Sequence, residues 1–259
     1  MKYFLISAFV IYALAFLLVL IYSFSKKGVL EKLSRYMLTF GLFLHLIALG
    51  IRTSETGHLP MFSMYETLLL YSFTTILVSV IVIFRYNERV TELITIPISL
   101  IAMVVAFINE SPGRELPLVL QTRWFEFHVS TSFAAYALFT LAFSGAVFYL
   151  LARVRGVKDD TSTDSACPAS DESISDDEAL NNQSVLGDYQ DIAGRGIVWG
   201  FFFFSASMFS AAVWAYLAWG IYWLWEPKTL WSSIVWFWFA GAMHAWHVKE
   251  WRGVGLSIA

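Results

Sequence analysis

Residues 3–24 read YFLISAFVIYALAFLLVLIYSF, a stretch without a charged side chain. A hydrocarbon core of about 30 Å requires about 20 apolar residues in a helix, so this stretch is long enough to cross a bilayer. It is longer than the apolar part of a signal peptide, only Lys2 precedes it as a charge, and no small-residue cleavage site interrupts it. The sequence therefore predicts a membrane span here and not a cleaved leader.

The rest of the chain has the same character. Of its 259 residues, 58% are hydrophobic and 14% are charged, whereas a soluble domain carries about 25% charged residues. The single cysteine, Cys167, excludes a disulfide framework and a CxxC redox pair. The sequence predicts an all-α fold, a polytopic transmembrane helix bundle of about seven spans, because six more apolar runs have helix length: residues 36–51, 65–84, 93–108, 128–151, 197–217 and 231–248.

Lysine and arginine gather in alternate connections between the expected spans. Twelve of the seventeen basic residues follow spans one, three, five and seven or precede span six. The other five lie before span one or in the remaining connections: Lys2, Arg52, Arg114, Arg123 and Lys228. Because basic residues accumulate on the cytoplasmic side of short loops, we expect the N-terminus outside and the C-terminus inside.

One connection differs from the others in composition. Residues 158–192 are rich in Asp, Glu, Ser and Asn and hold ten of the twenty acidic residues. This composition favours disorder, and a solvated linker is a simpler interpretation than a regulatory or metal-binding segment. We therefore divide the chain into transmembrane spans one to five with their short loops (1–157), an acidic disordered cytoplasmic linker (158–195), and a Trp-rich part with spans six and seven (196–259).

Tryptophan is concentrated near the C-terminus. Ten of the eleven tryptophans lie between Trp199 and Trp251, and five of them fall in VWAYLAWGIYWLWEPKTLW, residues 213–231, here called the Trp-rich segment. An interfacial anchoring belt explains two or three tryptophans at one helix end, but not this density. Indole rings beside Lys228 and Glu226 suit a flat, partly anionic ligand such as haem, while an interface belt or a quinone pocket stays open as an alternative.

Three histidines are candidate ligand residues. His128 opens span five at the expected outer face, where its imidazole is placed either to bind haem iron or to cap a helix end. His244 lies about thirteen residues into span seven, or ~20 Å along the helix, and an ionisable residue at that depth of a bilayer indicates function by default. His45 lies inside span two, where a ligand role and a hydrogen bond to a neighbouring helix are equally compatible with its position.

The Trp-rich segment resembles the WWD motif of the haem-handling proteins of cytochrome c maturation, whose core reads roughly WGxYWxWDPK. Two more stretches are similar to the CcsA (ResC-like) proteins of the System II pathway. GHLPMFSMYETLL, residues 57–69, is similar to the family's GHFPLSNLYESL, and RWFEFHVSTSFAAYALF, residues 123–139, is similar to its WLxxHVxxxxxxYA helix start. The three stretches follow the family's order and span most of the chain.

The resemblance implies a role for each matching residue. It makes His128 an outward-facing axial ligand of haem iron and His244 an intramembrane ligand, whereas His45 has no secure counterpart and stays a provisional cofactor-binding residue. The external haem platform that it implies comprises Trp214, Trp219, Gly220, Trp223, Trp225, Glu226, Pro227 and Lys228. The family continues into one more span with a second outer histidine, so we expect either a longer natural chain beyond Ala259 or a partner that supplies that ligand.

The resemblance therefore implies delivery of haem b and its attachment to the CxxCH motif of an apocytochrome c, within a thioether-forming cytochrome c haem lyase complex. The expected partner is a CcsB/ResB-like membrane protein, and no nucleic acid is expected. The chain is expected in the bacterial inner membrane or an equivalent membrane, with the Trp-rich segment facing the periplasm. Two other functions stay open: a non-catalytic membrane haem transporter or chaperone, and a quinone-binding membrane redox subunit.

Overall fold

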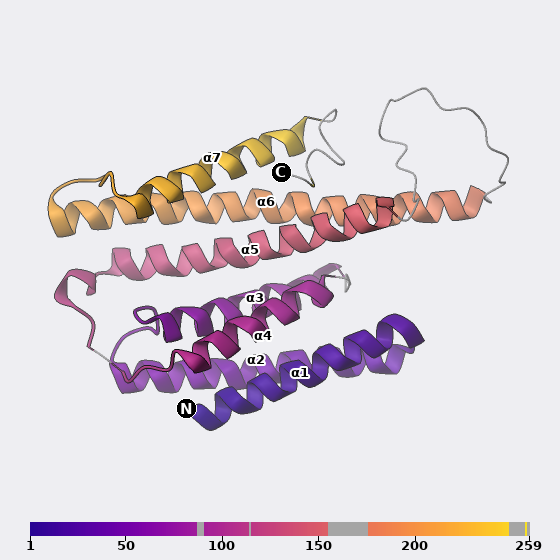
Figure 1. The fold of residues 1–259 in the computed structure, drawn as a ribbon, viewed down its shortest axis with the longest axis horizontal. Helices are drawn as coiled ribbons and strands as arrows, with labels where there is room; N and C mark the ends of the chain where they lie inside the picture. Colours follow the sequence, from indigo (N-terminus) through magenta and orange to yellow (C-terminus); the bar gives the residue numbers. More distant parts are fainter. Residues whose placement is uncertain (87–90, 114, 155–175, 249–256, 258–259) are drawn as a thin grey trace.

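The computed structural model describes residues 1–86, 91–113, 115–154, 176–248 and 257, and the side chains of these ranges except 176–185. The helices run roughly along one common direction (Figure 1). In chain order they are α1 (Lys2–Ser25), α2 (Gly28–Thr56), α3 (Met64–Tyr86), α4 (Glu92–Ile108), the short 3-10 helix η1 (Leu118–Leu120), α5 (Arg123–Val154), α6 (Asp176–Trp219) and α7 (Pro227–His247).

The predicted helical membrane bundle is confirmed, because each of the seven predicted spans falls on one of these α-helices. In the described part of the chain, five helical stretches are long and apolar enough to cross a membrane, namely α1, α2, α3, α5 and residues 186–219 of α6. The helix α4 is apolar but has only 17 residues. The protein is therefore an integral membrane protein. Each helix satisfies its backbone N–H and C=O groups by internal hydrogen bonds, as the hydrocarbon core of a bilayer requires.

The start of α6 differs from the sequence-based expectation. The helix begins at Asp176, so the prediction of a disordered linker over 158–195 is wrong for residues 176–195, while residues 158–175 lie outside the described part of the chain. Packing explains the difference, because Leu186, Ile192 and Ala193 are buried. Tertiary packing of this kind contributes more to helix stability in proteins than local composition does.

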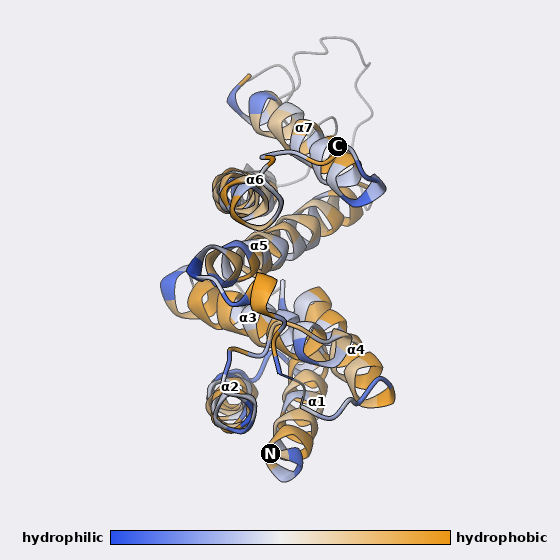
Figure 2. Cartoon of the chain, turned by 90° about the vertical axis from the view of Figure 1, so that its left-hand side faces the viewer, coloured by the Kyte–Doolittle hydropathy of each residue, from blue (hydrophilic) through white to orange (hydrophobic). Residues whose placement is uncertain are grey.

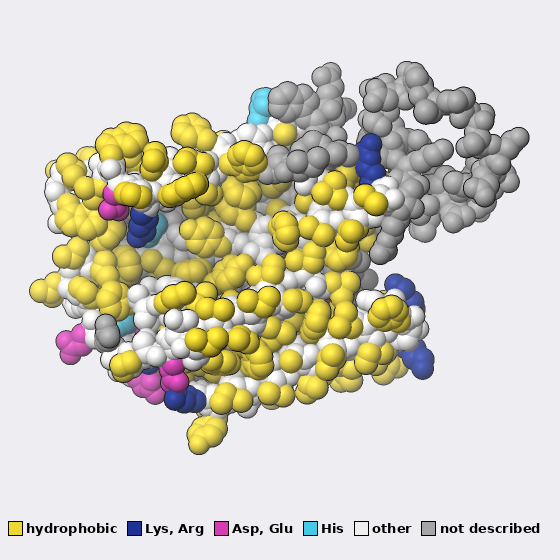
Figure 3. All heavy atoms as spheres, viewed as in Figure 1, with side chains coloured by type: hydrophobic (Ala, Val, Ile, Leu, Met, Phe, Trp, Pro, Cys, Tyr) yellow, Lys and Arg dark blue, Asp and Glu magenta, His cyan; other side chains and the backbone are white. Residues whose placement is uncertain are grey.

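The connections between helices divide over two ends of the bundle (Figure 1). Residues 57–63, 109–113, 115–122 and 220–226 lie at one end, here called the loop end. The junction of α1 and α2 and the C-terminal ends of α3, α5 and α7 lie at the other, here called the basic end. Hydrophobic side chains cover most of the face between the two ends (Figure 3). This arrangement agrees with the alternation of basic connections, while the side of the membrane that each end faces stays a prediction.

The first four helices share one hydrophobic core. Close approach of α1 and α2 depends on Gly41, where a Cβ atom would lie 2.7 Å from Cε1 of Tyr12. The fully buried residues of this core come from all four helices and include Leu5, Leu38, Leu69, Ile76, Ile96 and Met103. These helices form the part of the molecule farthest from α7 (Figures 1 and 2).

The helices α5 and α6 form the most extensive pair, and α7 packs on α6. The backbones of α5 and α6 approach closely at Gly196 of α6. A Cβ atom there would lie 2.9 Å from the carbonyl oxygen of Leu138 and 3.0 Å from the backbone nitrogen of Ala142, both in α5. Small residues allow this approach in membrane helices, where van der Waals packing drives association. The close packing of α5 and α6 fixes the position of the start of α5 relative to the end of α6, and both of these stretches line one cavity.

Candidate functional site

A cavity of about 170 Å³ lies at the loop end, between the start of α5, the end of α6 and the start of α7. Its walls come from stretches that are far apart in the sequence. Six residues that the sequence predicted for a cofactor site line this one cavity: His128, Trp214, Trp219, Trp223, Glu226 and Lys228. The structure therefore places the candidate imidazole next to the Trp-rich segment.

Ser207 of α6 orients the imidazole of His128. The Nδ1 atom lies 2.9 Å from the backbone oxygen of Ser207 and 2.9 Å from its Oγ. A carbonyl oxygen only accepts hydrogen bonds, so Nδ1 carries the proton and Nε2 carries the free lone pair. Metal-binding histidines are commonly held in this way. Within the described residues, Nε2 of His128 has no hydrogen-bond partner.

Two serines complete the support of His128. Ser132 donates a hydrogen bond to the carbonyl oxygen of His128 over 2.8 Å. Its hydroxyl oxygen accepts a hydrogen bond from Ser207, whose Oγ also lies 3.2 Å from the same carbonyl oxygen. Sequence reasoning missed both serines, since Ser207 lies 79 residues from His128 and no local pattern joins them.

Backbone geometry ends α6 and starts α7 at the cavity. Gly220 has a φ of 76°, a left-handed conformation that favours glycine, and its N–H donates to the carbonyl oxygen of Tyr216 over 2.8 Å. Pro227 occupies the first turn of α7, where its fixed φ suits a helix start. Two of the motif residues therefore shape the connection that carries Trp223 and Glu226.

Trp214 ties the Trp-rich segment to the connection before α5. Its Nε1 donates to the carbonyl oxygen of Val119 over 2.9 Å, and its ring lies 5.7 Å from that of Phe125 and 4.9 Å from that of Trp219, measured between centroids. Trp219 is 50% exposed and Trp225 is 82% exposed. One tryptophan is thus a structural anchor, and the other two are largely exposed.

The size of the cavity limits what enters it. Pockets that enclose a drug-sized ligand measure about 300–1,000 Å³, so a cavity of about 170 Å³ accepts one edge of a large flat ligand and leaves the rest outside. Glu226 and Lys228 are exposed and line the same cavity, which gives its rim one charge of each sign. These residues suit one edge of a large flat ligand that carries an anionic group.

The structure does not bring His244 to this site. His244 lies near the basic end of α7 on an exposed face, whereas His128 lies near the loop end. His45 is fully buried among α1–α4, with its ring 6.1 Å from that of Tyr12 and 5.7 Å from that of Phe73. Since α7 and α2 lie on opposite sides of the molecule (Figures 1 and 2), His45 and His244 do not share a ligand within one chain.

A buried ion pair braces the loop end. Nε of Arg52 donates to Oε1 of Glu66 over 2.9 Å, and the two side chains are 6% and 2% exposed. Glu66 and Ser63 cap the start of α3 reciprocally, since Ser63 N–H donates to Oε2 of Glu66 and Glu66 N–H donates to Oγ of Ser63. Arg52 also donates to the carbonyl oxygen of Ser111, which joins two of the three loop-end connections.

The fold and the cavity define a polytopic α-helical membrane protein with an oriented imidazole beside a tryptophan-lined cavity. Comparison with known proteins gives the family. Residues 61–259 match the family model described as "Cytochrome C assembly protein". This chain belongs to the cytochrome c assembly protein family.

Relatives named cytochrome c biogenesis protein CcsA are similar over most of the chain. The protein from Guillardia theta is 29% identical over 213 residues, which cover 80% of this chain and 70% of the relative. The protein from Mesostigma viride is 29% identical over 262 residues, which cover 93% of this chain and 84% of the relative. The protein from Heterosigma akashiwo (strain NIES-293 / 8280G21-1) is 30% identical and covers 75% of this chain.

Proposed function

We propose that this protein serves cytochrome c biogenesis by binding haem b at the loop-end cavity and presenting it to apocytochrome c. One observation carries the proposal: His128 lines a tryptophan-lined cavity with Nδ1 held by Ser207 and with no described hydrogen-bond partner at Nε2. An imidazole held in this way is a suitable axial ligand for haem iron. Family membership supports the same function, because cytochrome c assembly requires haem.

The residues around His128 take separate roles in this proposal. Trp219 and Trp223 receive one edge and one face of the macrocycle, since indole rings stack on flat π-systems. The exposed indole of Trp225 extends that surface. Lys228 pairs with a haem propionate through a charge-assisted hydrogen bond. Gly220 and Pro227 hold the connection in the conformation that presents these side chains.

The bond-forming groups belong to haem and to the apocytochrome. Each CxxCH thiol adds across one vinyl group: its sulfur bonds to one vinyl carbon, its hydrogen goes to the other, and no bond of this chain changes. The chain needs no nucleophile of its own. Its contribution is to hold haem in position, and orientation alone supplies several kcal/mol, up to about 7–11 in well-oriented reactions.

The remaining sequence-based assignments belong to the same proposal. His244 and His45 act separately from His128, with His244 as a contact for haem within the bilayer. A CcsB/ResB-like membrane partner completes the complex. The loop end faces the periplasm, where apocytochrome c is available, and the basic end faces the cytoplasm.

Haem content of the purified protein tests the proposal. We expect wild-type protein from haem-replete cells to carry haem, and His128→Ala to retain about 10–100-fold less at equal haem supply, because ligand loss removes the iron contact. His58→Ala is the matched control, since His58 is another loop-end histidine that does not line the cavity. Equal haem content in His128→Ala and wild type contradicts the assignment.

Co-expression with apocytochrome c and a CcsB/ResB-like partner separates the open alternatives. Attachment that depends on His128 supports the haem lyase role. Haem loading without attachment favours a transporter or chaperone. Purified protein that contains a quinone and shows no haem absorbance indicates a quinone-binding redox subunit.

A further inference from the structure

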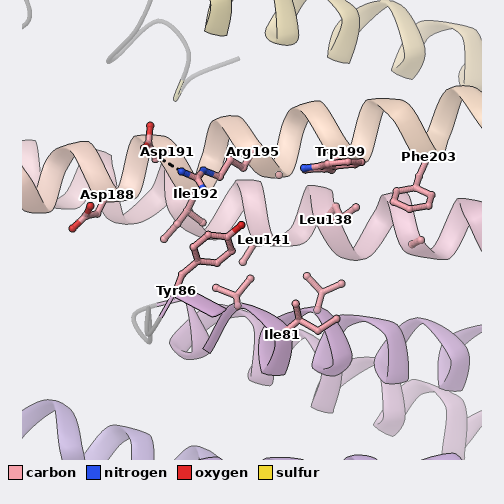
Figure 4. Close-up of a pocket in the computed structure, with 14 residues that line it drawn as sticks. Ile81, Tyr86, Leu138, Leu141, Asp188, Asp191, Ile192, Arg195, Trp199 and Phe203 are labelled. Carbon is pink, nitrogen blue, oxygen red and sulfur yellow. Dashed lines mark ion pairs between the residues drawn. The ribbon is translucent and has the colours of Figure 1, made fainter. Parts of the chain in front are cut away.

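A second and larger cavity lies towards the basic end, between α3, α5 and α6. Its volume is about 470 Å³, and none of the loop-end residues lines it. Most of its wall is apolar, contributed by Val78, Ile81, Leu138, Leu141, Ile192 and Phe203. Figure 4 shows the labelled lining side chains between α3 on one side and the adjacent helices α5 and α6 on the other. A cavity of this size and character suits an acyl chain.

Three charged residues stand along one side of this cavity. Asp188, Asp191 and Arg195 are the charged residues among its described lining, and their spacing of three and four residues places them along one face of α6. Arg195 lies 3.8 Å from Asp191 in an exposed ion pair, and its guanidinium is 5.0 Å from the centroid of the Tyr86 ring. Asp188 makes no ion pair with another described residue.

Aromatic residues place this charged group at the membrane surface. Tyr86 is the last residue of α3, and Trp199 is 56% exposed one turn after Arg195. Tyrosine and tryptophan are enriched at the level of lipid headgroups. From Arg195 to Phe203 the helix advances ~12 Å at 1.5 Å per residue, so the apolar wall extends from the headgroup level into the hydrocarbon. The cavity therefore has charged groups at the headgroup level and an apolar wall deeper in the membrane. A phospholipid has the same arrangement, with a polar headgroup above apolar acyl chains.

We propose that this cavity binds a phospholipid with a zwitterionic, amine-bearing headgroup, of the phosphatidylethanolamine class. The guanidinium of Arg195 pairs with the phosphate, and the carboxylate of Asp188 accepts hydrogen bonds from the ammonium group. One acyl chain lies along the apolar wall between α3 and α5. An anionic headgroup without an amine meets two carboxylates and one guanidinium, which disfavours it, and a trimethylated amine has no N–H to donate.

Lipid retention by the full chain tests this site. The protein is reconstituted in nanodiscs of equal parts phosphatidylethanolamine, phosphatidylcholine and phosphatidylglycerol, extracted into mild detergent, and its retained lipids are identified by native mass spectrometry. We expect phosphatidylethanolamine to be enriched about tenfold, and Arg195→Met to lower its retention about tenfold, which corresponds to one charge-assisted hydrogen bond. We expect Asp188→Asn to abolish the preference for the amine-bearing lipid over phosphatidylglycerol.

Two further variants distinguish a loss of lipid binding from a loss of folding. Arg153→Met removes an arginine from the last turn of α5 at the same end, outside the cavity, and is expected to retain lipid like wild type. Val78→Trp fills the cavity without changing a charge, and is expected to lose the lipid while its helical circular dichroism stays unchanged. Equal retention of the three lipids by wild type, full retention by Arg195→Met, or recovery of haem or a quinone from this cavity overturns the proposal.

Discussion

Neutralising Glu66 is expected to destabilise the protein strongly, because it removes the carboxylate that compensates the buried charge of Arg52. In Glu66→Gln the side chain keeps its shape, and one oxygen still accepts the N–H groups of Phe62 and Ser63. The substitution removes the negative charge that compensates the guanidinium of Arg52. Both side chains are buried, with 6% of Arg52 and 2% of Glu66 exposed. Breaking a buried ion pair on one side costs about 3–5 kcal/mol, and we expect a loss of about 3 kcal/mol here.

Equilibrium unfolding in mixed micelles measures this loss. The helical circular dichroism signal of the purified chain is followed against the mole fraction of sodium dodecyl sulfate for wild type, Glu66→Gln, Arg52→Met and the double variant. We expect the double variant to lose less free energy than the sum of the single variants, by about 0.5–3 kcal/mol, because it leaves no unpaired charge.

An exposed ion pair of the same chain is the control. Nζ of Lys2 lies 2.8 Å from Oε1 of Glu110, with side chains 65% and 42% exposed. Solvent screens such a pair, so Lys2→Met is expected to change the unfolding free energy by about 0–1 kcal/mol. The reasoning is refuted if Glu66→Gln stays within about 1 kcal/mol of wild type, or if the two single losses add without interaction.

Three more variants test other parts of the structure. Gly196→Val inserts a side chain between the α5 and α6 backbones and is expected to cost about 1–3 kcal/mol in the same unfolding assay; an unchanged midpoint contradicts the close packing. Gly220→Val forces a β-branched residue into a left-handed conformation and is expected to cost about 1–2 kcal/mol, with Gly28→Ala, a helix-start glycine in open space, as its control. Ser207→Ala keeps the backbone acceptor of His128 but removes the hydroxyl, and haem retention, measured by absorbance, is expected to fall about tenfold; full retention excludes a supporting role for the hydroxyl.

Hydropathy predicted the helices well, because a bilayer permits few alternatives to a long apolar helix. It failed for residues 176–195, where polar composition conceals a buried side that includes Leu186 and Ile192. A window dominated by Asp, Asn and Ser gives no sign of a helix whose buried side packs on neighbouring helices. The error is one of tertiary packing overriding local composition.

The candidate site was partly accessible from sequence. Tryptophan density and helix-end signals at Gly220 and Pro227 pointed to the connection between α6 and α7 that lines the loop-end cavity, since such residues have local conformational causes. The pairing of Ser207 with His128 depends on how α5 and α6 align, which no local pattern encodes. The capping pair Ser63 and Glu66 carries the local spacing S-x-x-E and could have been found, whereas the long-range partner Arg52 could not.

Rescue by free imidazole tests the central claim, which is that His128 binds haem iron through Nε2. His128→Gly removes the ligand and leaves space for imidazole, and its absorbance spectrum is recorded with added haem as imidazole is titrated. We predict that the variant alone has much weaker absorbance bands of histidine-ligated haem than wild type, because only haem at His244 remains, and that imidazole restores them towards the wild-type spectrum. A His128→Gly spectrum identical to wild type before imidazole is added contradicts the assignment of His128 as an iron ligand.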